Sequence, residues 1–135
     1  MKYVGLRLKK ISAEKFKNEF SGSIEVKSNF NLGEVKEEKE FSKNSKSPVF
    51  SFAFTYTLNY GEIAKIEFEG VVYVEIEDKS VVKELEKDKK TSDNELRKFI
   101  LDVVLARTHV ESLHLEEKLN LPFHIQSPRV SFGEK

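Results

Sequence analysis

The chain contains no cysteine and no tryptophan, and it has one methionine and three prolines in 135 residues. Without cysteine it cannot form disulfides, use a thiolate nucleophile or build the common zinc sites, and this composition fits a cytoplasmic protein. Excess charge is also missing, because Lys plus Arg and Asp plus Glu number 23 each. A neutral chain has no long-range attraction for nucleic acid or for an anionic membrane surface, so we expect neither as a partner.

Long hydrophobic runs are absent as well. No stretch approaches the 18 apolar residues that suggest a membrane-spanning helix, and the first ten residues lack the apolar region of a signal peptide. We therefore expect no membrane insertion. The length suits one domain, residues 1–135, which is large enough to bury a core without disulfides or metals.

Catalytic and cofactor signatures are also missing. The six glycines are dispersed along the chain and form no phosphate-binding loop. His109 and His114 are five residues apart, which separates them by about 140° on a helix and prevents a shared metal site of the i, i+4 kind. The sequence thus predicts no catalytic residues, no metal site and no cofactor, and we expect the protein not to be an enzyme.

The clearest pattern that is present lies in residues 50–60. Large apolar side chains occupy every second position, and small or polar residues lie between them, which predicts a β-strand with one apolar face. A turn-like segment follows, and then residues 64–76 repeat the same alternation. The two segments therefore predict an antiparallel hairpin. Its other face carries Glu67 and Glu69 beside lysines, which is typical of a solvated face or of a partner-docking surface.

Two earlier segments add strands. Val4, Leu6 and Leu8 predict a first strand that ends near Ile11, and residues 12–20 have the spacing of a short helical turn. Residues 24–32 predict a second strand with a bulge or bend at Ser28 and Gly33. The count is four antiparallel strands.

The sequence changes character after Ile76. Residues 80–90 form a charged connector that is partly helical by pattern. Residues 92–95 have the spacing of a capping box and open a long helix that ends near Asn120. The following segment, residues 119–125, is too apolar for an ordinary loop and should pack against another surface. The predicted fold class is α+β, with a four-stranded antiparallel sheet followed by a long C-terminal helix and an apolar post-helical loop.

The widths of these elements do not match. Four strands make a sheet roughly 19 Å across, whereas one helix with its side chains is about 10–12 Å wide. We expect the helix to cover only about half of the apolar face. The uncovered half predicts an oligomer interface, a client-binding groove or both.

Several local sequences resemble the SecB family of protein-export chaperones. The apolar strand at 50–58 and the following Ala64-Lys-Ile-Glu-Phe-Glu-Gly70 are similar to a strand pair of that family. Leu96-Arg-Lys-Phe-Ile100 resembles the start of its long helix, and Leu119-Asn-Leu121 and Pro128-Arg-Val-Ser-Phe132 resemble its C-terminal segments. The likeness depends on the order and spacing of these segments and covers nearly the whole chain.

The resemblance implies an ATP-independent holdase that binds non-native polypeptides in a hydrophobic groove. It also implies a homo-oligomer, with the tetramer of that family favoured and a dimer possible. Glu67 matches an acidic strand position of the family, so Glu67 and Glu69 are candidate partner-docking residues. Whether a translocase motor is the partner stays open. The alternative is an oligomeric interaction protein, for example a toxin–antitoxin-linked module, whose apolar face serves only self-association. The expected client-binding residues are Phe52, Phe54, Tyr56, Phe68, Val72, Phe99, Val103, Leu119, Leu121, Phe123 and Ile125.

Overall fold

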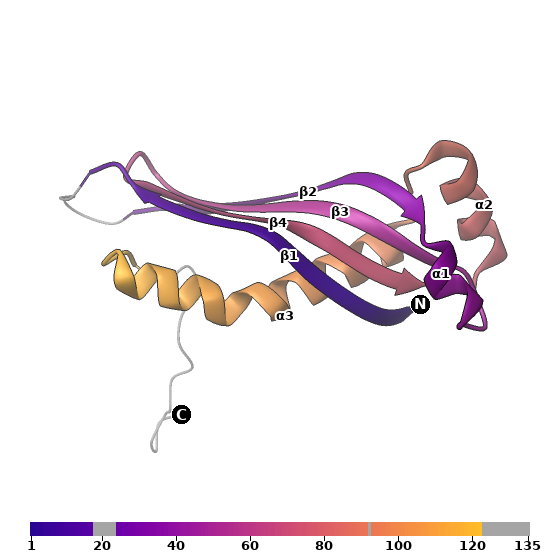
Figure 1. Cartoon of the computed structure of the whole chain (residues 1–135). Coiled ribbons are helices and arrows are strands. Elements are labelled where there is room, and N and C mark those ends of the chain that lie inside the picture. The colour runs from indigo at the N-terminus through magenta and orange to yellow at the C-terminus, as the bar shows by residue number, and fades with distance from the viewer. Residues whose placement is uncertain (18–23, 92, 123–135) are drawn as a thin grey trace, which may run out of the picture.

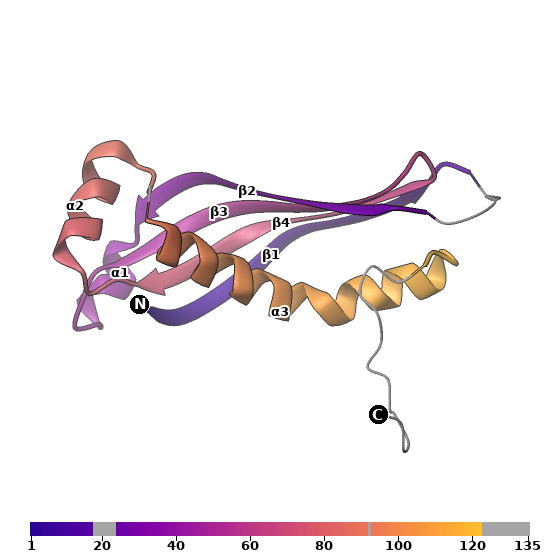
Figure 2. The ribbon, with the colours of Figure 1, turned by 180° about the vertical axis from the view of Figure 1, so that it is seen from behind.

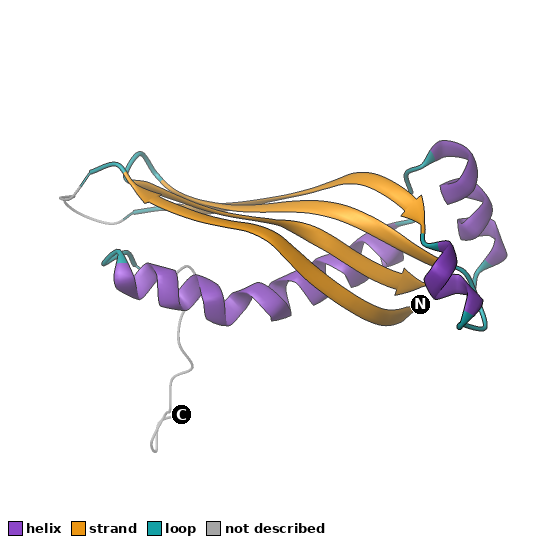
Figure 3. Cartoon of the chain, in the orientation of Figure 1, coloured by secondary structure: helices purple, strands orange, loops and turns teal. Residues whose placement is uncertain are grey.

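The computed structural model describes residues 1–17, 24–91 and 93–122. A four-stranded antiparallel sheet in the order β1-β4-β3-β2 forms the body of the chain, and a long helix runs lengthwise along one of its faces (Figures 1 and 2). Two shorter helices lie at one end of the sheet (Figure 3). The elements are β1 (Lys2–Lys15), β2 (Val26–Glu37), α1 (Lys39–Lys43), β3 (Val49–Tyr60), β4 (Ala64–Glu75), α2 (Lys79–Asp88) and α3 (Asn94–Lys118). This confirms the predicted α+β class, with its four antiparallel strands and long C-terminal helix.

The hairpin of β3 and β4 forms the centre of the sheet. Its strands pair from Val49 opposite Glu75 to Tyr60 opposite Ala64 without a break in register. Gly61 has a φ of +56° in the turn, a conformation that glycine adopts without steric penalty. The residues that alternation placed on one face of β3 are all buried. We call this the closed face, because α3 covers it, and we call the opposite one the open face.

Strand β1 is longer than the sequence suggested. It runs through to Lys15, with Ile11 opposite Phe68 and Ala13 opposite Ile66. The prediction of a helical turn from residue 12 is therefore wrong for Ser12–Lys15. The alternation of apolar residues continues through Ile11 and Ala13, and pairing with β4 outweighs the weak helical signal of Phe16 and Phe20.

Each edge strand contains a bulge. In β2 the register shifts between Leu32 and Val35, which confirms the bulge predicted at Gly33, whereas Ser28 pairs regularly with Leu58. In β1 a shift lies between Leu8 and Lys10, and a second one lies nearer its start. The two central strands are regular.

Helix α3 begins and ends with defined caps. The Asp93 carboxylate accepts hydrogen bonds from the backbone N–H of Glu95 and Leu96, at 2.9 and 3.1 Å. The cap is thus Asp93 and not the predicted Ser92. At the other end the Lys15 ammonium donates to the Leu119 carbonyl at 2.8 Å, so the end of β1 is fastened to the end of α3. A cation at this place also opposes the negative end of the helix dipole.

Helix α3 covers more of the sheet than its width suggested. Along β3 and β4 the apolar side chains of the closed face are buried within the single chain. Partly buried residues of the edge strands, such as Leu6, Leu8, Phe30 and Leu32, fill the margins of this core. The expectation of a half-uncovered face is therefore wrong for the two central strands, and the remaining apolar exposure lies elsewhere.

Candidate functional site

Five of the expected client-binding residues belong to the hydrophobic core. They come from β3 and β4, and each is at most 4% exposed. The closed face of the sheet holds them under α3, so a bound polypeptide could contact them only after α3 has moved. These five core residues are Phe52, Phe54, Tyr56, Phe68 and Val72.

The other expected residues lie on or after α3. Phe99 and Val103 are half-buried on the flank of the helix, and Leu119 is half-buried just after it. Leu121 is 7% exposed and belongs to the core cluster, and its backbone N–H donates to the Glu116 carbonyl at 2.8 Å. Phe123 and Ile125 lie outside the described residues. The post-helical segment thus begins inside the core.

The row of α3 residues that faces the sheet changes character halfway along the helix. Its members recur every four residues, and none is more than 1% exposed. Three aliphatic side chains come first and three polar ones follow. The row consists of Leu96, Ile100, Val104, Thr108, Ser112 and Glu116.

Glu116 is the charged member of this row, and it lies fully buried against the sheet. The Tyr60 hydroxyl donates a hydrogen bond to Glu116 Oε2. Burial, and next this hydrogen bond, raise the pKa of Tyr60 above its ordinary value. Burial, and then the charge of Glu116, also raise the pKa of Tyr56. Sequence reasoning missed Glu116, although it continues the four-residue spacing of Leu96, Ile100 and Val104.

A second row runs along α3 beside the row that faces the sheet. Phe99 and Val103 are half-buried against the core, whereas Ala106 and Val110 are exposed. The residues of this second row are spaced by four, three, four and three positions, which is the spacing of a helix that packs against another helix. Val110, the fourth member of this row, is 57% exposed. We call it the outer row, and its members are Phe99, Val103, Ala106, Val110 and Leu113.

Exposed large apolar side chains gather at β1. Among the described residues seven such side chains are exposed, and all but Phe41 and Val110 belong to β1 or flank it: Met1, Tyr3, Val4, Ile11 and Phe16. Strand β1 pairs only with β4, so the main-chain groups of its outer edge have no partner strand in the described part of the chain. The other edge strand, β2, contributes no exposed large apolar residue to that group. The β1 edge thus combines free hydrogen-bonding groups with apolar side chains.

The open face carries the two acidic residues that we expected to dock a partner. Lys10 lies 3.8 Å from Glu67 Oε1 and 3.5 Å from Glu69 Oε2, and Lys65 lies 4.0 Å from Glu67 Oε2. The face therefore presents paired charges of both signs at this place.

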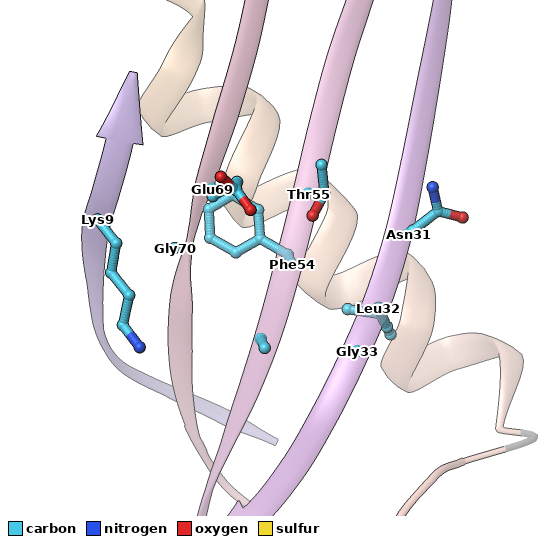
Figure 4. A pocket seen from close by; sticks show the side chains of 9 residues that line it. Lys9, Asn31, Leu32, Gly33, Phe54, Thr55, Glu69 and Gly70 are labelled. Carbon is cyan, nitrogen blue, oxygen red and sulfur yellow. The ribbon is translucent and has the colours of Figure 1, made fainter. Parts of the chain in front are cut away.

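A shallow hollow of about 270 Å³ crosses the open face (Figure 4). It lies where both edge strands bulge. The bulge of β1 follows Leu8, which pairs with Gly70, and the bulge of β2 follows Leu32, which pairs with Phe54. Gly70 and Phe54 pair with each other, so the two bulges lie at the same level of the sheet. Small residues form the floor of the hollow, and polar side chains surround it. Its lining includes Lys9, Asn31, Gly33, Ala53, Thr55 and Glu69.

The described residues form neither a metal site nor a membrane-spanning helix. No group of three or more His, Cys, Asp or Glu side chains in that part of the chain could hold a metal ion. None of the described helices is long and apolar enough to cross a membrane.

The order of the strands, the lengthwise helix and the short helices at one end define an α+β protein with a SecB-like fold. The SecB-like chaperone of Mycobacterium tuberculosis, solved in complex with a ChAD peptide from the HigA1 antitoxin, is similar in structure. The superposition covers 98% of this chain and 92% of that chain, with a TM-score of 0.50 and 11% sequence identity. At this identity the likeness concerns the fold alone. No protein-family model and no curated protein matches the sequence.

Proposed function

We propose that this protein is an ATP-independent chaperone that holds non-native polypeptides. The observation that carries the proposal is the outer edge of β1, where main-chain groups without a partner strand in the described part of the chain lie beside the exposed side chains of Tyr3 and Ile11. The SecB-like fold supports it, since the similar mycobacterial protein is a chaperone solved with a peptide.

An extended segment of a client would add to the sheet as a further strand along β1. Main-chain hydrogen bonds do not depend on the client sequence, while Tyr3 and Ile11 favour apolar client side chains. Burial of apolar surface stabilises such a complex by about 25 cal/mol per Å², against an ordering cost of about 2–5 kcal/mol for the client. One edge therefore binds weakly, and an oligomer that offers several edges to one client binds more tightly.

Aggregation of a chemically denatured client protein, followed by light scattering without ATP, tests the proposal. The wild-type chain should suppress scattering near equimolar ratio. Ile11→Lys places a charge on the β1 edge at a residue that is 46% exposed, so it should reduce suppression with little change in stability. Asn29→Lys makes a comparable change on β2 and serves as the control. Unchanged scattering with the wild-type chain would refute holdase activity, and equal loss with both variants would refute the β1 site.

A second candidate function is self-association without client binding, and the outer row of α3 favours it. Phe99, Val103, Ala106, Val110 and Leu113 provide the seam along which a second copy of α3 would pack. Val110→Glu should shift the sedimentation of a dimer or tetramer towards the monomer, with Asn29→Glu as the control. An oligomer that binds no apolar dye and no client would favour this function over the first.

A partner at Glu67 and Glu69 remains part of the proposal as a secondary surface. A cationic partner would compete with Lys10 for these carboxylates, so its binding should weaken with salt. Glu67→Gln with Glu69→Gln should abolish such binding and leave the binding of denatured client unchanged.

A further inference from the structure

The two halves of α3 are held to the sheet by different chemistry. In the first half Leu96, Ile100 and Val104 bury aliphatic side chains against the closed face. In the second half the same row continues with small or polar side chains, and half-buried leucines on the flanks supply the apolar contact. Burial of aliphatic surface is the main source of helix docking, so the second half is the more weakly docked one.

The polar side chains of the second half add little direct bonding to the sheet. Thr108 Oγ1 donates to the Val104 carbonyl and Ser112 Oγ donates to the Thr108 carbonyl, both at 2.8 Å. A hydroxyl has one hydrogen, so both donors are used within the helix itself. The hydrogen bonds that tie this half to the strands include those of the Tyr60 hydroxyl to Glu116 and of the Lys15 ammonium to the Leu119 carbonyl.

The two halves also cover different parts of the closed face. Leu96 lines a cavity with Ile76 and Val81, so the aliphatic half covers the end of the sheet next to α2. Glu116 contacts Tyr60, so the polar half covers the end with the β3–β4 turn, as Figure 1 shows. Tyr56 and Phe68 lie on this second end, and their rings stack with centroids 6.3 Å apart.

We propose that the Tyr60–Glu116 hydrogen bond is a latch, and that the second half of α3, from Thr108 to Lys118, opens from the sheet while the first half stays docked. Opening uncovers Tyr56, Tyr60 and Phe68 as an aromatic surface for non-native polypeptide. The inference rests on the proposed chaperone function. It assigns two of the expected client-binding residues, Tyr56 and Phe68, to the surface that opens, and it leaves Phe52 and Val72 in the permanent core.

Hydrogen exchange measured by mass spectrometry tests the latch without any client. Amides of Ser112–Glu116 should exchange about tenfold or more faster than those of Ile100–Val104, because local opening proceeds from the weakly docked half. Tyr60→Phe removes the donor and keeps the ring, so it should speed exchange from Thr108 onward and leave the first half unchanged. Equal exchange in both halves would overturn the latch, and so would acceleration confined to the last turn, which is ordinary fraying.

A second variant acts in the opposite direction and covers the case in which Tyr60→Phe fails to fold. Thr108→Val with Ser112→Ala extends the apolar row, so exchange of the second half should slow. Tyr73→Phe removes a hydroxyl on the open face and should change neither half. If this double variant leaves exchange of the second half unchanged, the latch is refuted.

Client binding then separates the latch from the chaperone function. With a fluorescent denatured client, Tyr60→Phe should raise the association rate and Thr108→Val with Ser112→Ala should lower it. If the halves exchange differently but no variant binds client, the latch stands and the proposed function fails. If all variants bind client at the same rate and the halves exchange alike, the function stands and the latch fails.

Discussion

The closed and open faces of the sheet are built from the same two central strands and differ in almost every other respect. On β4, Phe68 is fully buried under α3, whereas Glu67 points to the open face and pairs with Lys10. The open face is not simply exposed: Ser51 is buried there, and its hydroxyl donates to Glu38 at 2.9 Å beside α1. The difference teaches that alternation along a strand decides on which face each side chain lies. The packing of the helices decides how deeply each face is buried.

The largest expected effect separates neighbouring residues of β4. Phe68→Ala should lower the free energy of unfolding by about 3–5 kcal/mol, because it removes a fully buried ring and leaves a cavity. Glu67→Ala, one residue away on the open face, should change it by no more than about 0.5 kcal/mol. Urea denaturation followed by circular dichroism measures both. Similar losses for the two variants would mean that the faces are not distinct in stability.

A second pair of variants tests how closely the backbones of β1 and β4 approach each other at Gly70. A Cβ at Gly70 would lie 2.4 Å from the Arg7 carbonyl oxygen and 3.0 Å from the Phe54 ring. Gly70→Ala should therefore destabilise by about 1–3 kcal/mol, as overpacking does.

Gly33→Ala is the matched control in β2. Its new Cβ would meet Ala53 Cβ at 3.7 Å, which is an ordinary contact. In thermal denaturation this variant should have a melting temperature close to that of the wild-type chain. A larger loss of stability for Gly33→Ala than for Gly70→Ala would contradict the close approach at Gly70.

A third prediction concerns alkaline pH and the tyrosines of the closed face. Burial and Glu116 raise the pKa of Tyr60 and Tyr56 above the ordinary value of 10.0. The native state thus holds these protons more tightly than the unfolded state, so their contribution to stability is full below pH about 10 and is lost as the pH rises towards the native pKa values.

Tyrosinate absorbance measures this directly, and the chain has no tryptophan to obscure it. The native chain should ionise later than the urea-unfolded chain, and Tyr60→Phe should reduce that delay. Superimposable titration curves for native and unfolded chains would contradict the buried position of these hydroxyls.

The smallest effect belongs to the ion pairs of the open face. Lys10 is 55% exposed and bridges Glu67 and Glu69 at 3.8 and 3.5 Å. Lys10→Met should lower stability by no more than about 1 kcal/mol, and the difference should shrink in high salt. A loss that persists at 1 M salt would indicate that the lysine stem packs on the sheet and that its charge matters little.

Local pattern was sufficient to predict the hairpin and α3. Six alternating apolar residues identify β3 because only a strand places them on one face, and Gly61 follows at the turn. The end of β1 could not be predicted in this way, because Ser12–Lys15 become a strand only through pairing with β4. Glu116 was missed for a related reason: a charged residue joins the core only when a donor such as Tyr60 meets it, and sequence does not place the two together. The burial of Phe52 and Phe54 was not predicted, because an estimate that compares only the widths of the sheet and the helix ignores the partly buried residues at the margins of the core.

The order of the strands also has a consequence for synthesis. Strand β1 is made first, yet its partner β4 is made last among the strands, and Tyr3 finally pairs with Val74. Strands β2, β3 and β4 can pair in the order in which they leave the ribosome. At about 5–20 residues per second, β1 waits several seconds for its partner with Leu6 and Leu8 uncovered. Of the two edge strands, β1 is therefore the one that spends the longest time alone on the nascent chain.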